Sequence, residues 1–240
     1  MNRRAPGFSL IEMAFVLIIV TLLLGGLLVP FATQVEQKRM AETNKAMEEI
    51  KEALMGYALS HGAGSQPYLP CPDINNDGGE DRDIATGVCD LQEGSLPWAT
   101  LGVGSQDAWG NRYRYRVTKI FSDRVPGFNL TDPGTLTVCS NAPTVASPNV
   151  CPVIARSVPA VVLSGGKNGF GAIGVNTGIA NPAPASTDEA ENTTTGLNID
   201  IFVSRIFTGP GAPAGEFDDQ VVWISPNVLF YRMVAAGRLP

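Results

Sequence analysis

Alternating oxygen-bearing side chains follow the first cysteine of the chain, in the sequence CPDINNDGG. Asp73, Asn75 and Asp77 are spaced two residues apart, and Gly78 follows at once. This spacing matches the first half of a calcium-binding loop, in which alternate side chains turn oxygens inward and a glycine makes the sharp turn. The second half does not match, because Ile84 stands where the loop needs a glutamate. Two interpretations remain open, a calcium loop or a loop of Asx turns closed by a disulfide.

The four cysteines lie in two local pairs, Cys71 with Cys89 and Cys139 with Cys151. Neither pair has the C-x-x-C spacing of a zinc or redox site. If the domain is exported to an oxidising compartment, two disulfides are the simplest interpretation, although four cysteines permit three connectivities.

Motifs typical of enzymes are incomplete in this chain. The segment from Gly169 to Gly174 satisfies G-x-G-x-x-G, but a proline-rich stretch follows it, so no helix N-terminus is predicted to hold a pyrophosphate. Gly166 and Lys167 lack the upstream glycine and the Ser/Thr of a P-loop. No serine, cysteine or carboxylate pair is accompanied by a plausible base. We therefore expect no catalysis.

A single acid interrupts the most apolar stretch of the chain. Between Phe8 and Val29, Glu12 is the only charged residue. About 20 apolar residues suffice for a transmembrane helix, and a carboxylate within one costs roughly 2.5–3.5 kcal/mol. If the chain is cut between Gly7 and Phe8, the new α-amino group lies four residues before Glu12, on the same helical face. The amine of one subunit can then pair with the carboxylate of its neighbour, which relieves the cost of burying both charges and fixes the register of a helical bundle.

The charges that flank this stretch predict its orientation. Arg3 and Arg4 precede it, so the positive-inside rule keeps that end in the cytoplasm and exports the rest of the chain. A secretory signal peptide is the alternative. The apolar run is too long for a typical signal peptide, and no A-x-A cleavage site follows it. We therefore expect a retained anchor.

The sequence MNRRAPGFSLIE followed by an apolar helix resembles the N-terminus of type IV pilins and type II secretion pseudopilins. In that family a prepilin peptidase cuts after the glycine and N-methylates the new terminal residue, and the acid four residues later guides assembly. The resemblance implies these roles for Gly7, Phe8 and Glu12. It also implies the partners: further copies of the chain, other pilin-like subunits, the peptidase and an assembly platform in the inner membrane.

The function implied by this resemblance is that of a structural subunit. The chain would be anchored in a bacterial inner membrane by one helix, with its globular domain in the periplasm, and would then assemble into a type IV pilus or a type II secretion pseudopilus. The alternative is a minor pilin at a filament tip, with an adhesive or DNA-binding role.

Three segments of the body are similar to the major pseudopilin of type II secretion: DAWGNRYRY at 107–115, LSGGKNGFG and DDQVVW. In that family the last two segments supply calcium-binding aspartates. Asp219 stands four residues before Trp223, as the family's aspartate stands before its tryptophan, and Asn168 occupies the place of the other aspartate. The resemblance thus implies Asn168 and Asp219 as calcium ligands, a second candidate site beside the loop at 73–78.

Arg112, Arg114 and Arg116 alternate with Tyr113 and Tyr115. On a strand, this spacing places the arginines on one face and the tyrosines on the other. The arginines are then either in solvent, opposite a tyrosine core, or they form a row that captures DNA. The net charge of −6 argues against a general nucleic-acid binder. We therefore do not expect nucleic acid as a partner.

The elements that position these residues follow from hydrophobic periodicity. After a leader at 1–7 and an apolar helix at 8–30, an amphipathic continuation at 31–62 carries a stripe with 3-4 spacing that is predicted to pack on the globular domain at 63–240. The stripe consists of Met40, Thr43, Met47, Ile50, Leu54 and Tyr57.

Short β-type runs follow in the globular domain. Candidate strands are 112–121, 135–139, 159–164, 197–207 and 219–225. A short C-terminal helix is predicted between Ser225 and Gly237, and 178–196 and 208–215 are predicted mobile surface loops. The predicted fold is α+β: a long N-terminal helix, half transmembrane and half amphipathic, packed on an antiparallel sheet, with a short C-terminal helix.

Overall fold

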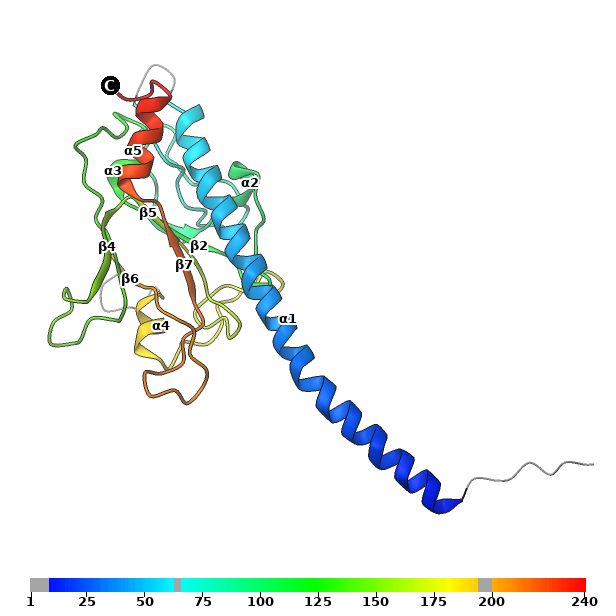
Figure 1. The fold of residues 1–240 in the computed structure, drawn as a ribbon. Helices are drawn as coiled ribbons and strands as arrows, with labels where there is room; N and C mark the ends of the chain where they lie inside the picture. The colour runs from blue at the N-terminus through cyan, green and yellow to red at the C-terminus, as the bar shows by residue number, and fades with distance from the viewer. Residues whose placement is uncertain (1–8, 63–65, 194–199) are drawn as a thin grey trace, which may run out of the picture. The chain divides into compact units, whose positions relative to one another are not determined.

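The computed structural model of this 240-residue chain describes residues 9–62, 66–193 and 200–240, with the backbone alone for 24–30. Its first element is α1 (Leu10–Ser60), a helix of 51 residues (Figure 1). The chain divides into two compact units, one ending at Ala41 and the other comprising Glu42–Pro240. The boundary between the two units falls within α1.

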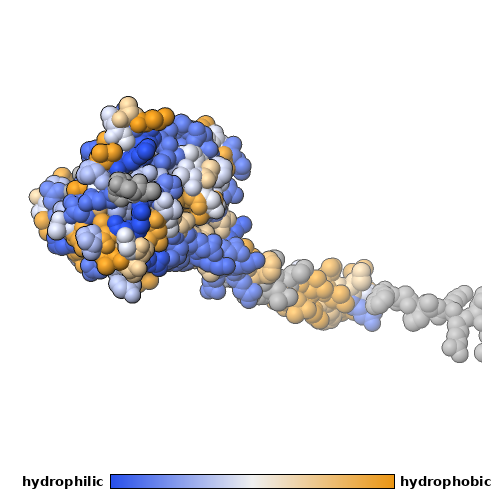
Figure 2. Space-filling model, turned by 90° about the horizontal axis from the view of Figure 1, so that it is seen from above, coloured by the Kyte–Doolittle hydropathy of each residue, from blue (hydrophilic) through white to orange (hydrophobic). Residues whose placement is uncertain are grey.

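The first unit contains the apolar part of α1. Its described side chains between Leu10 and Leu23 are exposed, and Figure 2 shows this segment as mostly hydrophobic. Within the described residues, no helix has an apolar stretch long enough to cross a membrane. The predicted span at 8–30 falls partly outside the described residues, because Phe8 and the side chains of 24–30 are not described.

The second unit begins with the amphipathic part of α1. The stripe predicted from the 3-4 spacing is buried in this unit, which confirms that it packs on the globular domain. Its buried members are Thr43, Met47, Ile50, Leu54 and Tyr57. Met40, the first residue of the predicted stripe, belongs to the other unit.

The main sheet of the second unit is antiparallel. Its strands are β1 (Glu93–Ser95), β2 (Arg114–Val117), β5 (Ala160–Ser164) and β7 (Gln220–Trp223), in the order β1-β2-β5-β7. In the central pairs, Tyr115 lies opposite Val162, and Val162 lies opposite Val222.

Both faces of this sheet are covered, which explains why β5 reads as a continuous apolar run. On one face, Tyr115 and Val162 pack in the same core as the buried stripe of α1 and residues of α5 (Pro226–Ala235). On the other face, Val161 and Leu163 pack against a second sheet. The second unit therefore has three layers: the helices α1 and α5, the main sheet and the second sheet.

The second sheet has the order β4-β3-β6, from β4 (Val153–Val158), β3 (Leu136–Cys139) and β6 (Ile201–Val203). The β3–β4 pair is antiparallel, whereas the β3–β6 pair is parallel. The prediction of a single antiparallel sheet is therefore too simple. Parallel strands need a long connection, and here it passes through β4, β5 and α4 (Thr187–Glu191).

Most predicted elements of the body are present with shorter bounds. The strand predicted at 112–121 is present as β2, but its last residues form a short helix, α3 (Lys119–Ser122). Of the strand predicted at 197–207, residues 197–199 lie outside the described residues. β1, β4 and the short helix α2 (Trp98–Leu101) are not predicted. α5 begins directly after Ser225, as predicted, and ends two residues before Gly237.

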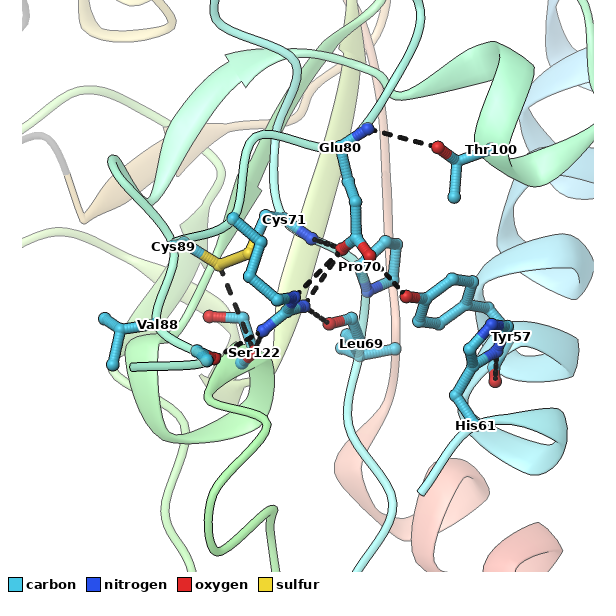
Figure 3. Close-up of polar contacts among 12 residues, drawn as sticks. Tyr57, His61, Leu69, Pro70, Cys71, Glu80, Val88, Cys89, Thr100 and Ser122 are labelled. Carbon is cyan, nitrogen blue, oxygen red and sulfur yellow. Dashed lines mark hydrogen bonds and ion pairs between the residues drawn. A yellow bond between two sulfur atoms is a disulfide. The ribbon is translucent and has the colours of Figure 1, made fainter. Parts of the chain in front are cut away.

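A polar network centred on Glu80 joins the end of α1 to the first disulfide loop (Figure 3). Glu80 Oε1 accepts a hydrogen bond from the Tyr57 hydroxyl at 2.7 Å, and Glu80 Oε2 accepts from the Cys71 amide at 2.9 Å and from Arg82 at 3.0 Å. Arg82 also donates to the carbonyl oxygens of Leu69, Gly87 and Ser122. Because these donors and acceptors are partly buried and satisfied, the network fixes the loop to the helix.

Candidate metal centre

Three carboxylates from two distant segments meet beside the start of β7. Glu189 lies on α4, and Asp218 and Asp219 immediately precede β7. One carboxylate oxygen from each of the three residues lies within 4.8 Å of the corresponding oxygens of the other two. All three residues are buried. No other group of three acidic, histidine or cysteine side chains in the described residues meets this condition.

Hydrogen bonds to one side of the cluster hold the carboxylates in place. Glu189 Oε1 accepts from the Asp218 amide and from Asn168 Nδ2, each at 3.1 Å. Asp218 Oδ2 accepts from the Asn168 amide at 2.8 Å, and Asp219 Oδ2 accepts from Asn192 Nδ2 at 2.8 Å. The cluster is thus tied to the loop at Asn168 and to the residue that follows α4.

The other side of the cluster has oxygens that lack donors. Glu189 Oε2 and Asp218 Oδ1 are buried and have no hydrogen-bond partner in the described structure. Buried carboxylate oxygens are normally satisfied, so such a pair calls for an explanation. The backbone also approaches closely here, because a Cβ on Gly166 would lie 2.6 Å from Asp218 Oδ1.

Burial makes the charged form of these acids unfavourable. It raises the pKa of Asp218 to about 6, with further contributions from the neighbouring charges of Glu189 and Glu216. Burial also raises the pKa of Asp219 well above its usual value, and it raises the pKa of Glu189. A bound cation would remove this penalty, and an all-oxygen donor set suits a hard divalent ion. The cluster can therefore bind a metal.

The structure brings together only part of the predicted ligand set. Asp219 belongs to the cluster, and Asn168 lies beside it but acts as a donor, since its own Oδ1 accepts the Phe170 amide at 3.0 Å. Glu189 and Asp218 were missed. The adjacent Asp218-Asp219 pair was a usable signal, whereas Glu189 lay in a stretch predicted as a mobile loop. That prediction is wrong for 187–191, which form α4 with buried acids.

The loop after Cys71 contributes no residue to this cluster. Asp73 is buried, and its two oxygens accept from the amides of Asn76 at 2.6 Å and Gly78 at 2.8 Å. Asn75 Oδ1 accepts from the Asp77 amide at 2.8 Å. These contacts are those of the Asx-turn interpretation, in which the side-chain oxygens bond the loop's own backbone.

Two disulfides are present, Cys71–Cys89 and Cys139–Cys151. This is the pairing of sequence neighbours, one of the three connectivities left open by the sequence. The first closes the loop that carries Glu80 and Arg82, and the second closes the connection between β3 and β4.

Two of the three arginines in the row are paired with acids. Glu93 Oε1 accepts from Arg114 Nε at 2.9 Å, Glu93 Oε2 accepts from Arg116 at 3.3 Å, and Asp200 accepts from Arg116 at 2.6 Å. The interpretation that places these arginines in solvent is therefore wrong for Arg114 and Arg116, whose side chains are 15% and 13% exposed. The tyrosines between them are in the core, as expected.

At the N-terminus, Gly7 and Phe8 lie outside the described residues. Glu12 is described, and it forms a capping box with Ser9 at the start of α1. The Ser9 amide donates to Glu12 Oε2 at 2.9 Å, and the Glu12 amide donates to Ser9 Oγ at 3.3 Å. Both are donors that a helix start otherwise leaves without a partner.

No protein-family description, curated protein or solved structure matches this chain.

Proposed function

We propose that the chain is a prepilin-type structural subunit. It is cut after Gly7, methylated at Phe8 and assembled through its first helix into a type IV pilus or a type II secretion pseudopilus. The observation that carries the proposal is Glu12, an acid in the first turn of a helix whose described residues from Met13 to Leu23 are exposed and, apart from Thr21, apolar.

The capping box is compatible with an assembly role for Glu12. One carboxylate accepts several hydrogen bonds, so Glu12 can accept from Ser9 and also pair with the amine of a neighbouring subunit. The exposed apolar side chains favour burial against lipid or against equivalent helices. In this proposal the helix anchors the subunit in the inner membrane, with the globular domain in the periplasm, until the assembly platform transfers the subunit to the filament.

We further propose that the ion at the metal centre is calcium. Three carboxylates, two of them with buried oxygens that lack donors, supply the negative charge and the oxygen ligands that calcium prefers. The ion would hold α4 against the start of β7, a structural role without catalysis.

The filament-tip alternative with a DNA-binding role has less support. Phosphate contacts need several free cations, whereas Arg114 and Arg116 are paired with Glu93 and Asp200, which leaves Arg112 alone of the row. These ion pairs do not distinguish an adhesive minor pilin at the filament tip from a principal subunit. The copy number of the chain in filaments distinguishes the two.

Mass spectrometry of the N-terminal peptide tests the proposal, using membranes and sheared surface filaments from cells that express the full chain. A methylated Phe8 terminus, abundant in sheared filaments, is the result expected of a principal pilus subunit. The same terminus confined to membranes identifies a pseudopilin or a scarce minor pilin. A chain that still begins at Met1, or that is cut beyond Val29, contradicts the proposal.

A further inference from the structure

A cavity of about 140 Å³ lies next to the arginine row, on the second unit. Its polar wall includes Arg112, Arg114 and Ser95, and its apolar wall includes Ile74, Phe170 and Ile173. These residues come from the first disulfide loop, from β1, from β2 and the residues just before it, and from the glycine-rich segment at 169–174. That glycine-rich segment, which no helix follows directly, forms one wall of this cavity.

Arg112 differs from the other two arginines of the row. Its Nε is buried and has no hydrogen-bond partner among the described residues. Arg112 and Arg114 are two residues apart in extended chain, so they share a face, but Arg114 is paired with Glu93 at 2.5 Å. A buried donor without an acceptor is unfavourable, and a charged one more so. The cavity therefore contains a cation with unused donor capacity.

The acids that line the cavity are already engaged. Both oxygens of Glu93 accept from Arg114 and Arg116. Both oxygens of Asp73 accept from backbone amides of its own loop. Asp219 Oδ2 accepts from Asn192 Nδ2. Asp219 also belongs to the candidate metal centre. No hydrogen bond joins any of these three acids to the side chain of Arg112 in the described residues, so Arg112 can pair with an anion from outside the chain.

We propose that this cavity binds a small monocarboxylate with an apolar substituent. A guanidinium pairs with a carboxylate through two parallel hydrogen bonds, and the side chains of Ile74, Phe170 and Ile173 offer an apolar surface to the rest of the ligand. The volume is below the roughly 300–1,000 Å³ of pockets that hold drug-sized ligands, so the ligand is about the size of one large side chain. A free organic acid and the C-terminal residue of a peptide both present this chemistry.

Calorimetric titration of the full chain tests the proposal with matched probes. Phenylacetate and isovalerate represent free acids, N-acetyl-leucine represents a peptide C-terminus, and phenylacetamide is the uncharged match for phenylacetate. We expect an acid to bind and phenylacetamide to bind at least tenfold more weakly. A preference for N-acetyl-leucine over isovalerate identifies a peptide terminus as the source, and the reverse identifies a free acid. Equal binding of phenylacetate and phenylacetamide, or no binding of any acid, overturns the proposal.

Two substitutions locate the binding at Arg112. Arg112→Met is expected to weaken acid binding at least tenfold, whereas Arg156→Met, which removes an exposed arginine of β4, leaves it unchanged. Arg112→Lys keeps the charge and is expected to stay within tenfold of the original affinity. Unchanged binding in a folded Arg112→Met protein overturns the proposal, and the acid–amide comparison on the unaltered chain decides it if that variant does not fold.

Discussion

The backbone amide of Asp218 donates to Glu189 Oε1 at 3.1 Å, while Asp218 Oδ1 and Glu189 Oε2 are both buried without a donor. In both Asp218 and Glu189, one carboxylate oxygen is thus held by hydrogen bonds and the other has none in the described residues. This arrangement joins α4 to the start of β7, two elements that the sequence separates by the stretch containing β6. A cation there would compensate two carboxylates that burial disfavours.

Calcium is expected to raise the thermal unfolding temperature of the full chain, and Glu189→Gln is expected to remove this effect. At a free calcium concentration 100 times Kd, binding stabilises a protein by about 2.7 kcal/mol, which for a domain of this size corresponds to roughly 5–10 °C. Glutamine retains the acceptor for the Asp218 amide but removes the charge. Calorimetry with calcium and with chelator measures both effects.

Asp77→Asn is the matched control, because it removes a carboxylate from the loop after Cys71 and leaves the cluster intact. It should respond to calcium as the unaltered chain does. If Asp77→Asn abolishes the response and Glu189→Gln retains it, the ion binds in the loop instead. An unfolding temperature that changes neither with calcium nor with chelator contradicts both sites.

In the presence of chelator, Asp218 should make the protein less stable as the pH rises. The folded-state pKa of Asp218 is about 6, against 3.8 for the unperturbed group, so the folded state binds the proton more tightly. Its contribution to stability is full below about pH 4 and is lost as the pH rises through about 6. Because solvent screens part of the interaction that raises the pKa of Asp218, the free energy of unfolding is expected to fall by on the order of 1 kcal/mol.

The measurement that isolates this contribution is the difference between the unaltered chain and Asp218→Asn in urea unfolding from pH 4 to pH 7.5. The difference should move in favour of the variant as the pH rises. A difference that does not vary with pH contradicts the assigned pKa. Added calcium should reduce the trend above pH 6, since the ion competes with the proton for the same carboxylate.

Local periodicity predicted the elements that bury one clear face. The stripe from Thr43 to Tyr57 was predictable for this reason. The central strand β5, which is buried on both faces, was predictable from its continuous apolar run, and the helix after Ser225 from the residues that start and end it. β1 was not predictable, because its residues, EGS, contain no apolar side chain and form a strand only through pairing with β2. The parallel pairing of β3 with β6 depends on how distant segments pack, so it cannot be predicted from the local sequence pattern of either strand.

The sequence predicted only part of the three-carboxylate cluster, because burial of the other residues depends on tertiary packing. Asp219 and Asn168 were inferred from a resemblance that covers short segments around each. Glu189 is polar, lies among prolines and alanines, and has no periodic neighbours, so its sequence context indicates a surface loop. Only the position of α4 beside Asp218 buries it. The ion pair between Arg114 and Glu93 could not be predicted either, because Glu93 lies on β1, a strand that the sequence did not predict.

Glu93→Gln is expected to destabilise the domain by about 2–4 kcal/mol in urea unfolding. Glu93 is 14% exposed and is the partner of both Arg114 and Arg116, so its removal leaves two partly buried cations with fewer acceptors. Glu49→Gln is the comparison, since Glu49 pairs with Lys45 at 3.7 Å while their side chains are 64% and 80% exposed. That change should cost less than about 0.5 kcal/mol. Equal effects of the two variants would show that the arginines do not depend on Glu93.

Three substitutions at the start of α1 separate the capping role of Glu12 from its proposed role in assembly. Glutamine can replace glutamate in a capping box, so Glu12→Gln keeps the bond from the Ser9 amide and removes the charge. Glu12→Ala removes both. Ser9→Ala removes the hydroxyl that accepts from the Glu12 amide and keeps the charge, at a cost to helix stability of about 1 kcal/mol.

If the charge of Glu12 pairs with the amine of a neighbouring subunit, Glu12→Gln and Glu12→Ala should both reduce the filament-associated fraction at least tenfold, while Ser9→Ala assembles nearly normally. If capping is what matters, Glu12→Gln should assemble and Ser9→Ala should fail together with Glu12→Ala. Immunoblots of sheared filaments and of membranes distinguish these patterns, provided that N-terminal sequencing shows each variant to be processed. A normal yield of filaments from Glu12→Ala would exclude both roles, because that variant retains neither the charge nor the acceptor.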